Sequence, residues 1–359
     1  MNTTILTVGL ADRAYDICIG SSLLDACPLP DSIRPVHAIV ITDETVAQLY
    51  LDRTVTALEK SFSRIATLKV PAGESSKSVA VCESLWQQMI SHGADRNSVV
   101  VALGGGVPGD IAGFVAATFA RGIRFIQIPT TLLAQVDSSV GGKTGINLPL
   151  AKNIVGAFWQ PRAVIIDPDV LATLPDEQYQ SGLAEVVKYG VIDDAELFEF
   201  LESNRDQIIR RDVEVMTEVI AWCCRIKARV VEEDEKETSG RRMILNYGHT
   251  YGHAVESVFG YGHYTHGAAI AMGMNAAARL AIELGICEPQ LLSRQTQLLS
   301  GLGLPAGMPE QRHDEILAAM QRDKKVLDGT LNLILPEKLG SVAIVPAPDD
   351  ETILRSFTS

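Results

Sequence analysis

The chain lacks several features that would place it in a special class. Its 6 cysteines include no Cys-x-x-Cys pair, so neither a zinc ribbon nor a dithiol redox motif is predicted, and reduced thiols are expected. Its 31 Lys and Arg are outnumbered by 44 Asp and Glu, and the net charge of −13 excludes a general attraction to nucleic acid or anionic membranes. No apolar run reaches the roughly 18 residues of a membrane helix, and no signal peptide is recognisable at the start. These absences predict a cytoplasmic protein with neither a membrane nor a nucleic acid as partner.

The remaining composition is that of an ordinary folded protein. With 47% hydrophobic residues, the 359 positions suffice for two domains of roughly 150 residues or more each. Four β-branched runs have the continuous apolar character of parallel strands buried on both faces. They occupy 38–42, 98–103, 125–129 and 163–167. Helical spacing fills 44–62 and 78–91, so the pattern predicts βαβ units on a Rossmann-like, mostly parallel sheet.

After residue 174 the pattern becomes helical. Helical spacing occupies 178–189, 195–207, 212–233, 247–258 and 266–284. Two strand-like pieces follow late in the chain, at 330–335 and 340–344. We therefore expect an α/β domain over residues 1–180 and a mainly helical domain over residues 181–359.

A glycine-rich turn, GGGVPGD at 104–110, directly follows the second apolar run. Glycines let backbone amides approach a pyrophosphate, and the helix that follows offers its positive N-terminus. The turn does not follow the first strand, as it does in the usual dinucleotide fingerprint, and a purely structural turn would also use these glycines. Asp43 or Glu44, after the first run, is the acidic candidate for a ribose hydroxyl.

A polar segment, PTTLLAQVDSSVGGKTGIN at 129–147, starts at the end of the third run. Its hydroxyls, carboxylate and ammonium lie at the carboxyl end of a predicted strand, where open α/β sheets bind their ligands. Lys152 and Asn153 extend the same polar segment.

The second half contains a candidate metal site. His249 and His253 are four residues apart and share one helix face, and His266 follows thirteen positions later. With Glu185 they could supply one carboxylate and two imidazoles, which is a catalytic zinc set with an open position. Thr250 stands where a zinc protease of the HExxH type needs Glu, which disfavours that class. A single histidine taken alone is more often a structural residue than a metal ligand.

Together these motifs resemble the 3-dehydroquinate synthase family of sugar phosphate cyclases. The match rests on GGGVPGD, PTTLLAQVDSSVGGKTGIN, AKN, GLAEVVKYG, IKARVV with DEKE, LNYGHTYGH, HG at 266–267 and RDKKV. The quoted motifs lie between residues 104 and 326, and the resemblance as a whole begins at about residue 42, so it covers nearly the whole chain. The long PTTLLAQVDSSVGGKTGIN block is the most specific, whereas GGGxxGD also occurs in glycerol and iron-type alcohol dehydrogenases.

The resemblance implies which residues hold the cofactors and the substrate. A Zn²⁺ or Co²⁺ ion would be held by Glu185, His249 and His266, with His253 as a catalytic neighbour. NAD⁺ contacts are implied at Asp43, Glu74, Lys77, Gly106, Val107, Pro108, Gly109, Asp110, Thr130, Thr131, Lys143, Lys152, Val170, Leu171, Ala172 and Thr173. Substrate contacts are implied at Asp137, Lys143, Asn153, Lys188, Lys227, Arg242 and Lys324 or Lys325. Arg121 would reach the substrate phosphate, from the neighbouring subunit of a homodimer.

The reaction that the resemblance implies converts 3-deoxy-D-arabino-heptulosonate 7-phosphate into 3-dehydroquinate and phosphate, a step of the shikimate pathway to aromatic amino acids. It would proceed by NAD-cycled oxidation, β-elimination, reduction, ring opening and aldol closure, with the metal as Lewis acid. Another sugar phosphate cyclase, a metal-dependent polyol dehydrogenase and an inactive NAD-binding regulator are the alternatives.

The chain departs from the family pattern in three places, one of which is Pro108 in the glycine turn, where an aliphatic residue is more usual. Ala268 stands after His-Gly, where the family usually has Glu, so a carboxylate that could support a metal ligand is missing. One residue is additional between Glu237 and His249, so Arg242 is assigned by counting back from His249.

Overall fold

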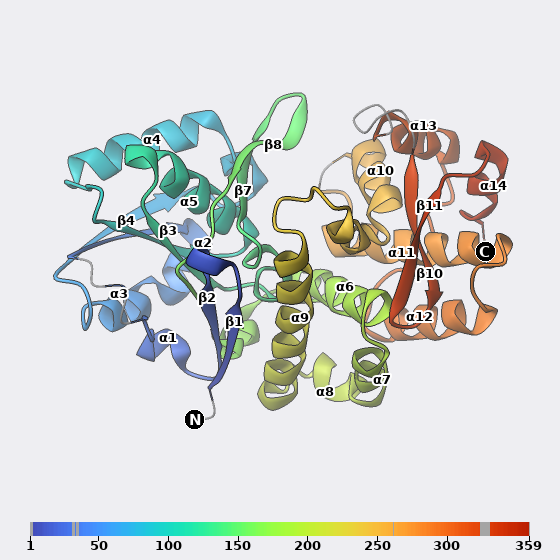
Figure 1. Cartoon of the computed structure of the whole chain (residues 1–359), viewed down its shortest axis with the longest axis horizontal. Helices are drawn as coiled ribbons and strands as arrows, with labels where there is room; N and C mark the ends of the chain where they lie inside the picture. The colour runs from blue at the N-terminus through green and yellow to red at the C-terminus, as the bar shows by residue number, and fades with distance from the viewer. Residues whose placement is uncertain (1–2, 31–32, 34–35, 261, 324–330, 359) are drawn as a thin grey trace. The chain divides into compact units, whose positions relative to one another are not determined.

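The computed structural model describes residues 3–30, 33, 36–260, 262–323 and 331–358 (Figure 1). Its internal contacts divide the chain into two compact units. Unit 1 consists of Met1–Leu174 and Met216–Lys236, and unit 2 of Pro175–Val215 and Glu237–Ser359. The sequence pattern assigns 212–233 to the second domain, but most of this helix, α9 (Val213–Glu233), belongs to unit 1.

Unit 1 is built on a seven-stranded sheet with the order β1-β2-β9-β6-β5-β3-β4. Its strands are β1 (Thr4–Val8), β2 (Tyr15–Ile19), β3 (His37–Asp43), β4 (Arg64–Val70), β5 (Val99–Gly104), β6 (Arg124–Pro129) and β9 (Ala163–Ile166). Among these described strands, β1 pairs antiparallel with β2 and every other pair is parallel. The predicted mostly parallel sheet is confirmed, although the sequence analysis did not predict β1, β2 and β4.

Helices cover both faces of this sheet. One face packs against α1 (Leu23–Ala26) and α3 (Asp52–Leu58), and the other against α4 (Val79–Ser91) and α5 (Gly106–Thr118) (Figure 1). Alternate residues of β3 point into opposite apolar clusters, which is why the strand is a continuous apolar run. Each fully buried Val or Ile of such a strand stabilises the fold by about 1.5–3 kcal/mol.

The strand order reverses between β3 and β5, since β4 lies on one side of β3 and β5 on the other. The register pairs Thr42 with Leu103, so Asp43 and Gly104 end neighbouring strands at the same edge. Gly104 is paired with Pro129 of β6, and its carbonyl accepts a hydrogen bond from the Thr130 backbone at 2.9 Å. Such a reversal is where open α/β sheets bind nucleotides.

A β-hairpin that the sequence analysis did not predict occupies the polar segment beyond residue 142. Its strands are β7 (Lys143–Leu148) and β8 (Ala151–Phe158), and β7 packs on α5. The strands approach closely at two facing glycines, because a Cβ on Gly156 would lie 2.3 Å from the Thr144 carbonyl oxygen. Most of β8 is exposed, so it lacks the apolar run that marks the buried strands.

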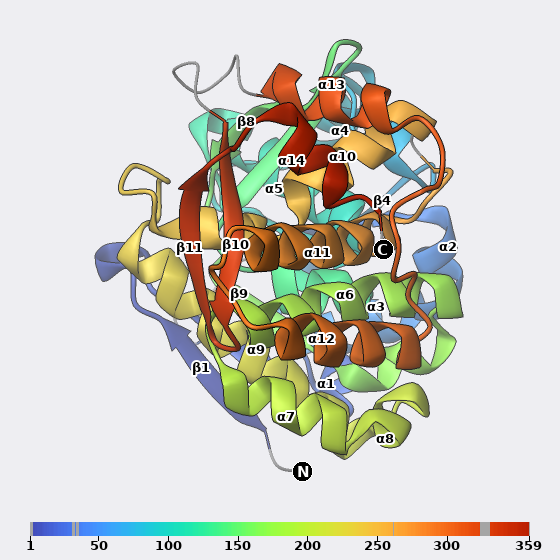
Figure 2. The ribbon, with the colours of Figure 1, turned by 90° about the vertical axis from the view of Figure 1, so that its right-hand side faces the viewer.

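Unit 2 is mainly helical, as predicted. It contains α6 (Asp176–Ile192), α7 (Ala195–Ser203), α8 (Arg205–Ile209), α10 (His249–Phe259), α11 (His266–Glu283), α12 (Pro289–Gly301), α13 (His313–Asp323), α14 (Asp350–Arg355), and the hairpin of β10 (Asn332–Lys338) with β11 (Ser341–Pro346). Helix α11 packs against α6, α10, α12 and β10 (Figure 2). Glycines permit this close packing, since a Cβ on Gly267 would lie 2.1 Å from the Ser181 carbonyl oxygen of α6.

Two expectations about the whole chain can be compared with the structure. All six cysteines lie within the described residues and are free thiols. No described helix combines the length and the apolar character needed to cross a membrane.

Candidate functional site

The glycine turn joins β5 to α5 at the point where the strand order reverses. The N-cap of α5 is Gly105, which has no side chain to cap the helix, so the first turn can offer its N–H groups to an anion. A Cβ on Gly104 would lie 2.5 Å from Pro108 Cγ, and one on Gly105 would lie 2.9 Å from Thr131 Cγ2. Packing therefore demands these two glycines, and the tight turn that they permit also fits a dinucleotide.

Asp43 lies at the end of β3 beside this turn. Its Oδ1 accepts hydrogen bonds from the backbone N–H groups of Thr45 and Val46 at 2.8 and 2.9 Å, which caps the short helix α2 (Glu44–Val46). The cap holds the carboxylate at the edge of the sheet, in a place suited to a ribose hydroxyl. Glu44, the other candidate, is exposed on the first turn of that helix.

A buried ion pair connects predicted NAD contacts with a predicted substrate contact. Lys77 is buried, and its Nζ lies 2.7 Å from Asp110 Oδ2 and 3.7 Å from Glu74 Oε1. The same ammonium donates to Asn153 Oδ1. Burial raises the pKa of Asp110, and the charge of Lys77 opposes that rise. Residues from β8, α5 and the 3₁₀ turn at Glu74–Ser76 thus form one polar cluster.

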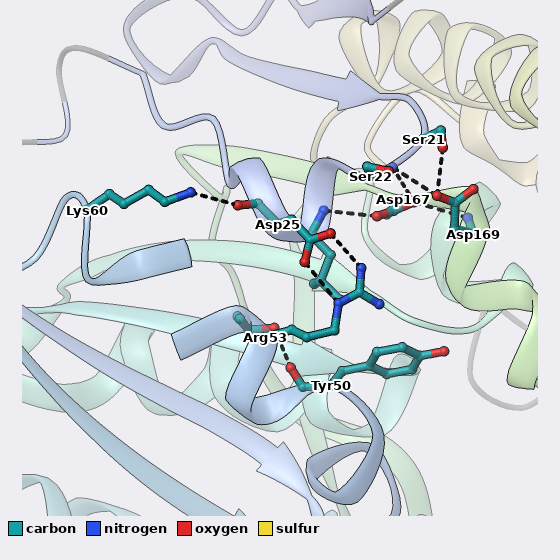
Figure 3. Close-up of polar contacts among 10 residues, drawn as sticks. Ser21, Ser22, Asp25, Tyr50, Arg53, Lys60, Asp167 and Asp169 are labelled. Carbon is teal, nitrogen blue, oxygen red and sulfur yellow. Dashed lines mark hydrogen bonds and ion pairs between the residues drawn. The ribbon is translucent and has the colours of Figure 1, made fainter. Parts of the chain in front are cut away.

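Four further predicted NAD contacts, residues 170–173, lie on the 3₁₀ helix η6 (Pro168–Thr173). Figure 3 shows the network that fixes the start of this helix. The buried carboxylate of Asp167 accepts backbone hydrogen bonds from Ser22, Leu24 and Asp169 at 3.2, 3.0 and 3.1 Å. Burial raises the pKa of Asp167, and these hydrogen bonds lower it. This network anchors η6 to the loop after β2.

Asp137 and Lys227, both predicted to hold the substrate, form an ion pair within unit 1. Lys227 on α9 is buried, and its Nζ lies 2.7 Å from Asp137 Oδ1. Nearby, the Cys224 thiol of α9 donates to the Gln135 carbonyl at 3.3 Å. Two contacts therefore hold α9 against the turn Ala134–Ser138, and they explain why most of α9 belongs to unit 1.

The remaining predicted residues of unit 1 are partly at the surface. Thr130 is buried and Thr131 half-buried, with its hydroxyl accepting from the Ala134 backbone at 3.2 Å. Lys143, Lys152 and Arg121 are exposed.

The predicted metal residues come together on three helices of unit 2. Glu185 of α6 is 1% exposed, and its Oε1 lies 3.5 Å from Nε2 of His249 and 3.5 Å from Nε2 of His266. The three ligand atoms lie within 4.8 Å of one another. Lys188, one helical turn after Glu185, forms an ion pair with Glu185 Oε2. One carboxylate oxygen and two imidazole nitrogens at these separations suit a divalent metal such as Zn²⁺ or Co²⁺.

The two imidazoles have opposite pKa shifts. Burial, and next the positive charge of Lys188, lower the pKa of His249 well below its ordinary value, so this ring is neutral, as a metal ligand must be. Burial also lowers the pKa of His266, but hydrogen bonds with Glu185 and Glu256 outweigh it and raise the pKa to about 9. This ring therefore carries a proton at neutral pH without a metal, and a metal ion would have to displace that proton to bind it.

The second nitrogen of each imidazole is also held. His249 Nδ1 lies 3.2 Å from the Tyr247 carbonyl oxygen, and His266 Nδ1 lies 3.4 Å from Glu256 Oε2. Partners of this kind orient metal-binding histidines. Sequence analysis missed Glu256, although it follows His249 by seven residues and so lies on the same helix face. Glu256 gives His266 a carboxylate partner in a chain that has Ala268 after His-Gly.

His253 lies beside the ligand set. Its ring centroid is 5.2 Å from that of His249 and 6.0 Å from that of His266, and the side chain is exposed. With Glu256 and His266 it forms a second group of potential ligands. Its exposure distinguishes it from the buried Glu185, which fits the predicted role of a neighbour.

The predicted anion-binding residues of unit 2 are only partly described. Arg242, on the 3₁₀ helix η7 (Arg241–Asn246), is buried, and its Nε lies 3.5 Å from Glu237 Oε1. Lys324 and Lys325 lie outside the described residues.

The chain matches known proteins along its length. Family models described as 3-dehydroquinate synthase N-terminal and C-terminal match residues 67–181 and 182–326. A 3-dehydroquinate synthase of Rhodopirellula baltica is 48% identical over 360 residues, which cover 98% of this chain and 96% of that protein.

Two solved structures resemble the whole chain. One is 2-epi-5-epi-valiolone synthase from Streptomyces hygroscopicus subsp. jinggangensis with NAD⁺ and Zn²⁺ bound, with a TM-score of 0.88, 28% identity and 95% of both chains covered. The other is a 2-deoxy-scyllo-inosose synthase complexed with carbaglucose-6-phosphate, NAD⁺ and Co²⁺, with a TM-score of 0.86, 29% identity and 99% of both chains covered. The predicted fold class is thereby confirmed. Full-length identity of 48% and two family models that meet at residues 181 and 182 show that the chain belongs to the 3-dehydroquinate synthase family.

Proposed function

We propose that this chain converts 3-deoxy-D-arabino-heptulosonate 7-phosphate into 3-dehydroquinate and phosphate, with NAD⁺ held in unit 1 and Zn²⁺ or Co²⁺ held by Glu185, His249 and His266. The carrying observation is the buried Glu185 carboxylate, whose Oε1 lies 3.5 Å from both imidazole nitrogens. The glycine turn at the strand reversal supports the cofactor assignment. Family membership supports the reaction.

The two groups would supply the chemistry that amino-acid side chains lack. Bound NAD⁺ would give a hydride acceptor and donor within one turnover, and a bound divalent metal would give a Lewis acid for the substrate's hydroxyl and carbonyl oxygens. The chain's own residues then have to bind two anionic groups, hold the sugar ring and exchange protons.

The basic side chains serve the carboxylate and the phosphate of this substrate. Arg242 presents a planar, permanently charged guanidinium, which suits a carboxylate. Lys227 is fixed beside Asp137, and Lys188 beside Glu185, so each ammonium has a defined position. Arg121 is exposed on the turn Phe119–Arg121. In a homodimer it would contact the phosphate of the substrate that is bound in the neighbouring subunit. The exposed imidazole of His253 is suited to exchanging protons with solvent.

A phosphate-release assay tests the reaction. With the heptulosonate phosphate as substrate, we expect phosphate release that requires both NAD⁺ and a divalent metal, with no NADH accumulating. A constant NADH absorbance follows from regeneration of the cofactor in each turnover. A polyol dehydrogenase would instead accumulate NADH in proportion to product. Phosphate release that persists after verified removal of the metal would contradict the metal assignment.

Substitution of Arg242 tests the carboxylate assignment. Arg242→Ala should lower kcat/KM by about 100-fold, because hydrogen bonds to a charged group contribute about 1.5–3 kcal/mol each. With a substrate analogue that has a hydroxymethyl group in place of the carboxylate, the same substitution should lower kcat/KM much less. Arg241→Ala is the matched control, since Arg241 adjoins Arg242 and pairs with Asp193 at 3.2 Å. A large loss in the control and none in Arg242→Ala would shift the assignment by one residue.

A further inference from the structure

A cavity of about 410 Å³ lies within unit 1 at the edge of the sheet opposite to the glycine turn. Its lining includes Arg124, which begins β6, Arg162, which precedes β9, and Arg96, which lies in the loop before β5. These strands are neighbours and parallel, so their amino ends share one edge. The glycine turn follows the carboxyl end of β5, and a six-residue strand separates the two edges by about 17 Å. The cavity is therefore separate from the predicted cofactor site.

The lining has charge of one sign. Five of its ten described residues are cationic and none is acidic, although the whole chain carries a net charge of −13. Besides the three arginines named above, the cationic residues are Arg13 and Lys236. Arg13 already forms an ion pair with Glu235 at 2.6 Å. No described residue forms an ion pair or hydrogen bond with the side chains of Arg96, Arg124, Arg162 or Lys236. Like charges that converge without partners repel one another, and an anion would remove that cost.

One wall of the cavity is aromatic. Phe158 and Trp159, at the end of β8, line it together with Gly122. The Trp159 ring lies over Gly122, where a Cβ would be 2.4 Å from the ring. The indole is also fixed, since its Nε1 donates to the Ile123 carbonyl at 2.9 Å. A fixed aromatic wall beside guanidinium groups suits a ligand with an apolar or planar body as well as anionic groups.

We propose that this cavity binds a small molecule that carries at least two carboxylate or phosphoryl groups and packs its body on Phe158 and Trp159. A guanidinium group binds a carboxylate and a phosphoryl group equally well through two parallel hydrogen bonds. An experiment therefore has to decide whether the ligand carries carboxylates or phosphoryl groups. The inference does not depend on the proposed reaction, because none of the residues assigned to substrate or cofactors lines the cavity.

Fluorine NMR of the full chain labelled with 5-fluorotryptophan can test this proposal, because Trp159 is one of only 3 tryptophans. The probes are pyrophosphate, as the phosphoryl source, and benzene-1,3-dicarboxylate, as an aromatic dicarboxylate. We expect at least one of them to shift the Trp159 resonance in a saturable way below about 10 mM, whereas Trp86 and Trp222 stay unchanged. The shift should persist when the substrate site is saturated with a substrate analogue.

Variants decide whether the arginines bind the probe. Arg124→Ala with Arg162→Ala should weaken binding at least about tenfold. Arg210→Ala should leave it unchanged, since Arg210 is an exposed arginine outside the cavity. Unaltered Trp86 and Trp222 resonances show that the double variant is folded. The single variant Arg96→Ala, in an exposed loop, removes one lining cation with less risk to folding.

Two results would overturn the proposal. One is a Trp159 resonance that neither probe shifts, or that shifts equally in the double variant. The other is a double variant whose molar mass in light scattering differs from that of the unaltered chain, when the unaltered chain also binds neither probe. The cavity would then be part of an interface between copies of the chain.

Discussion

Glu185→Ala should abolish tight metal binding and lower kcat by about a thousandfold or more, because the variant loses the one carboxylate of the ligand set. It should also destabilise the protein, since Lys188 is buried beside this carboxylate and would become an uncompensated charge, at a cost of about 3–5 kcal/mol. The measurements are metal content after dialysis against a weak chelator, phosphate release, and urea unfolding of the metal-free protein.

Two further variants separate the metal role from the structural one. Lys188→Met with Glu185→Ala removes the unpaired charge and should restore stability but not metal binding. Glu256→Gln keeps all three ligands and should weaken metal affinity by about 10- to 100-fold, as expected for a residue that orients His266. Retention of one tightly bound metal ion by Glu185→Ala would disprove the ligand assignment.

Sequence reasoning succeeded where a local pattern determines the structure. The run at 38–42 was predicted as a strand because burial on both faces requires an unbroken apolar sequence. The hairpin of β7 and β8 was missed because neither strand is a continuous apolar run and most of β8 is exposed. The strands also approach closely at two facing glycines, which no apolar pattern reports. β4 alternates buried and exposed residues, so a test for period two would have detected it.

The candidate site shows the same division. The spacing of His249 and His253 placed both on one helix face, but spacing alone could not choose the metal ligand. In the structure the Nε2 atom of His249 lies 3.5 Å from buried Glu185, whereas His253 is exposed, and this supports the prediction that His249 is the ligand. Contacts such as that between Lys227 and Asp137, which lie 90 residues apart, join α9 to unit 1, and no local pattern reports them. The domain division and the assignment of individual residues to NAD⁺ and substrate stay predictions.

Gly267→Ala should destabilise unit 2 by about 3 kcal/mol or more and weaken metal binding at the same time. The added Cβ would lie 2.1 Å from the Ser181 carbonyl oxygen and 2.4 Å from Ser181 Cα. These are backbone atoms of α6, so the two helices must separate to admit the methyl group. Gly267 adjoins His266, and Ser181 precedes Glu185 by one helical turn. The separation therefore increases the distance between two metal ligands, which urea unfolding and metal titration measure independently.

Gly307→Ala provides the control, because a Cβ there would meet no atom within 4 Å and the residue does not have a positive φ. We expect its free energy of unfolding to stay within about 0.5 kcal/mol of the unaltered chain, with unchanged metal affinity. If Gly267→Ala lost stability but bound metal normally, the close approach of α6 and α11 would serve packing alone. A joint loss means that the same glycine contact that packs the two helices also sets the ligand geometry, since metal affinity depends on the separation of Glu185 and His266.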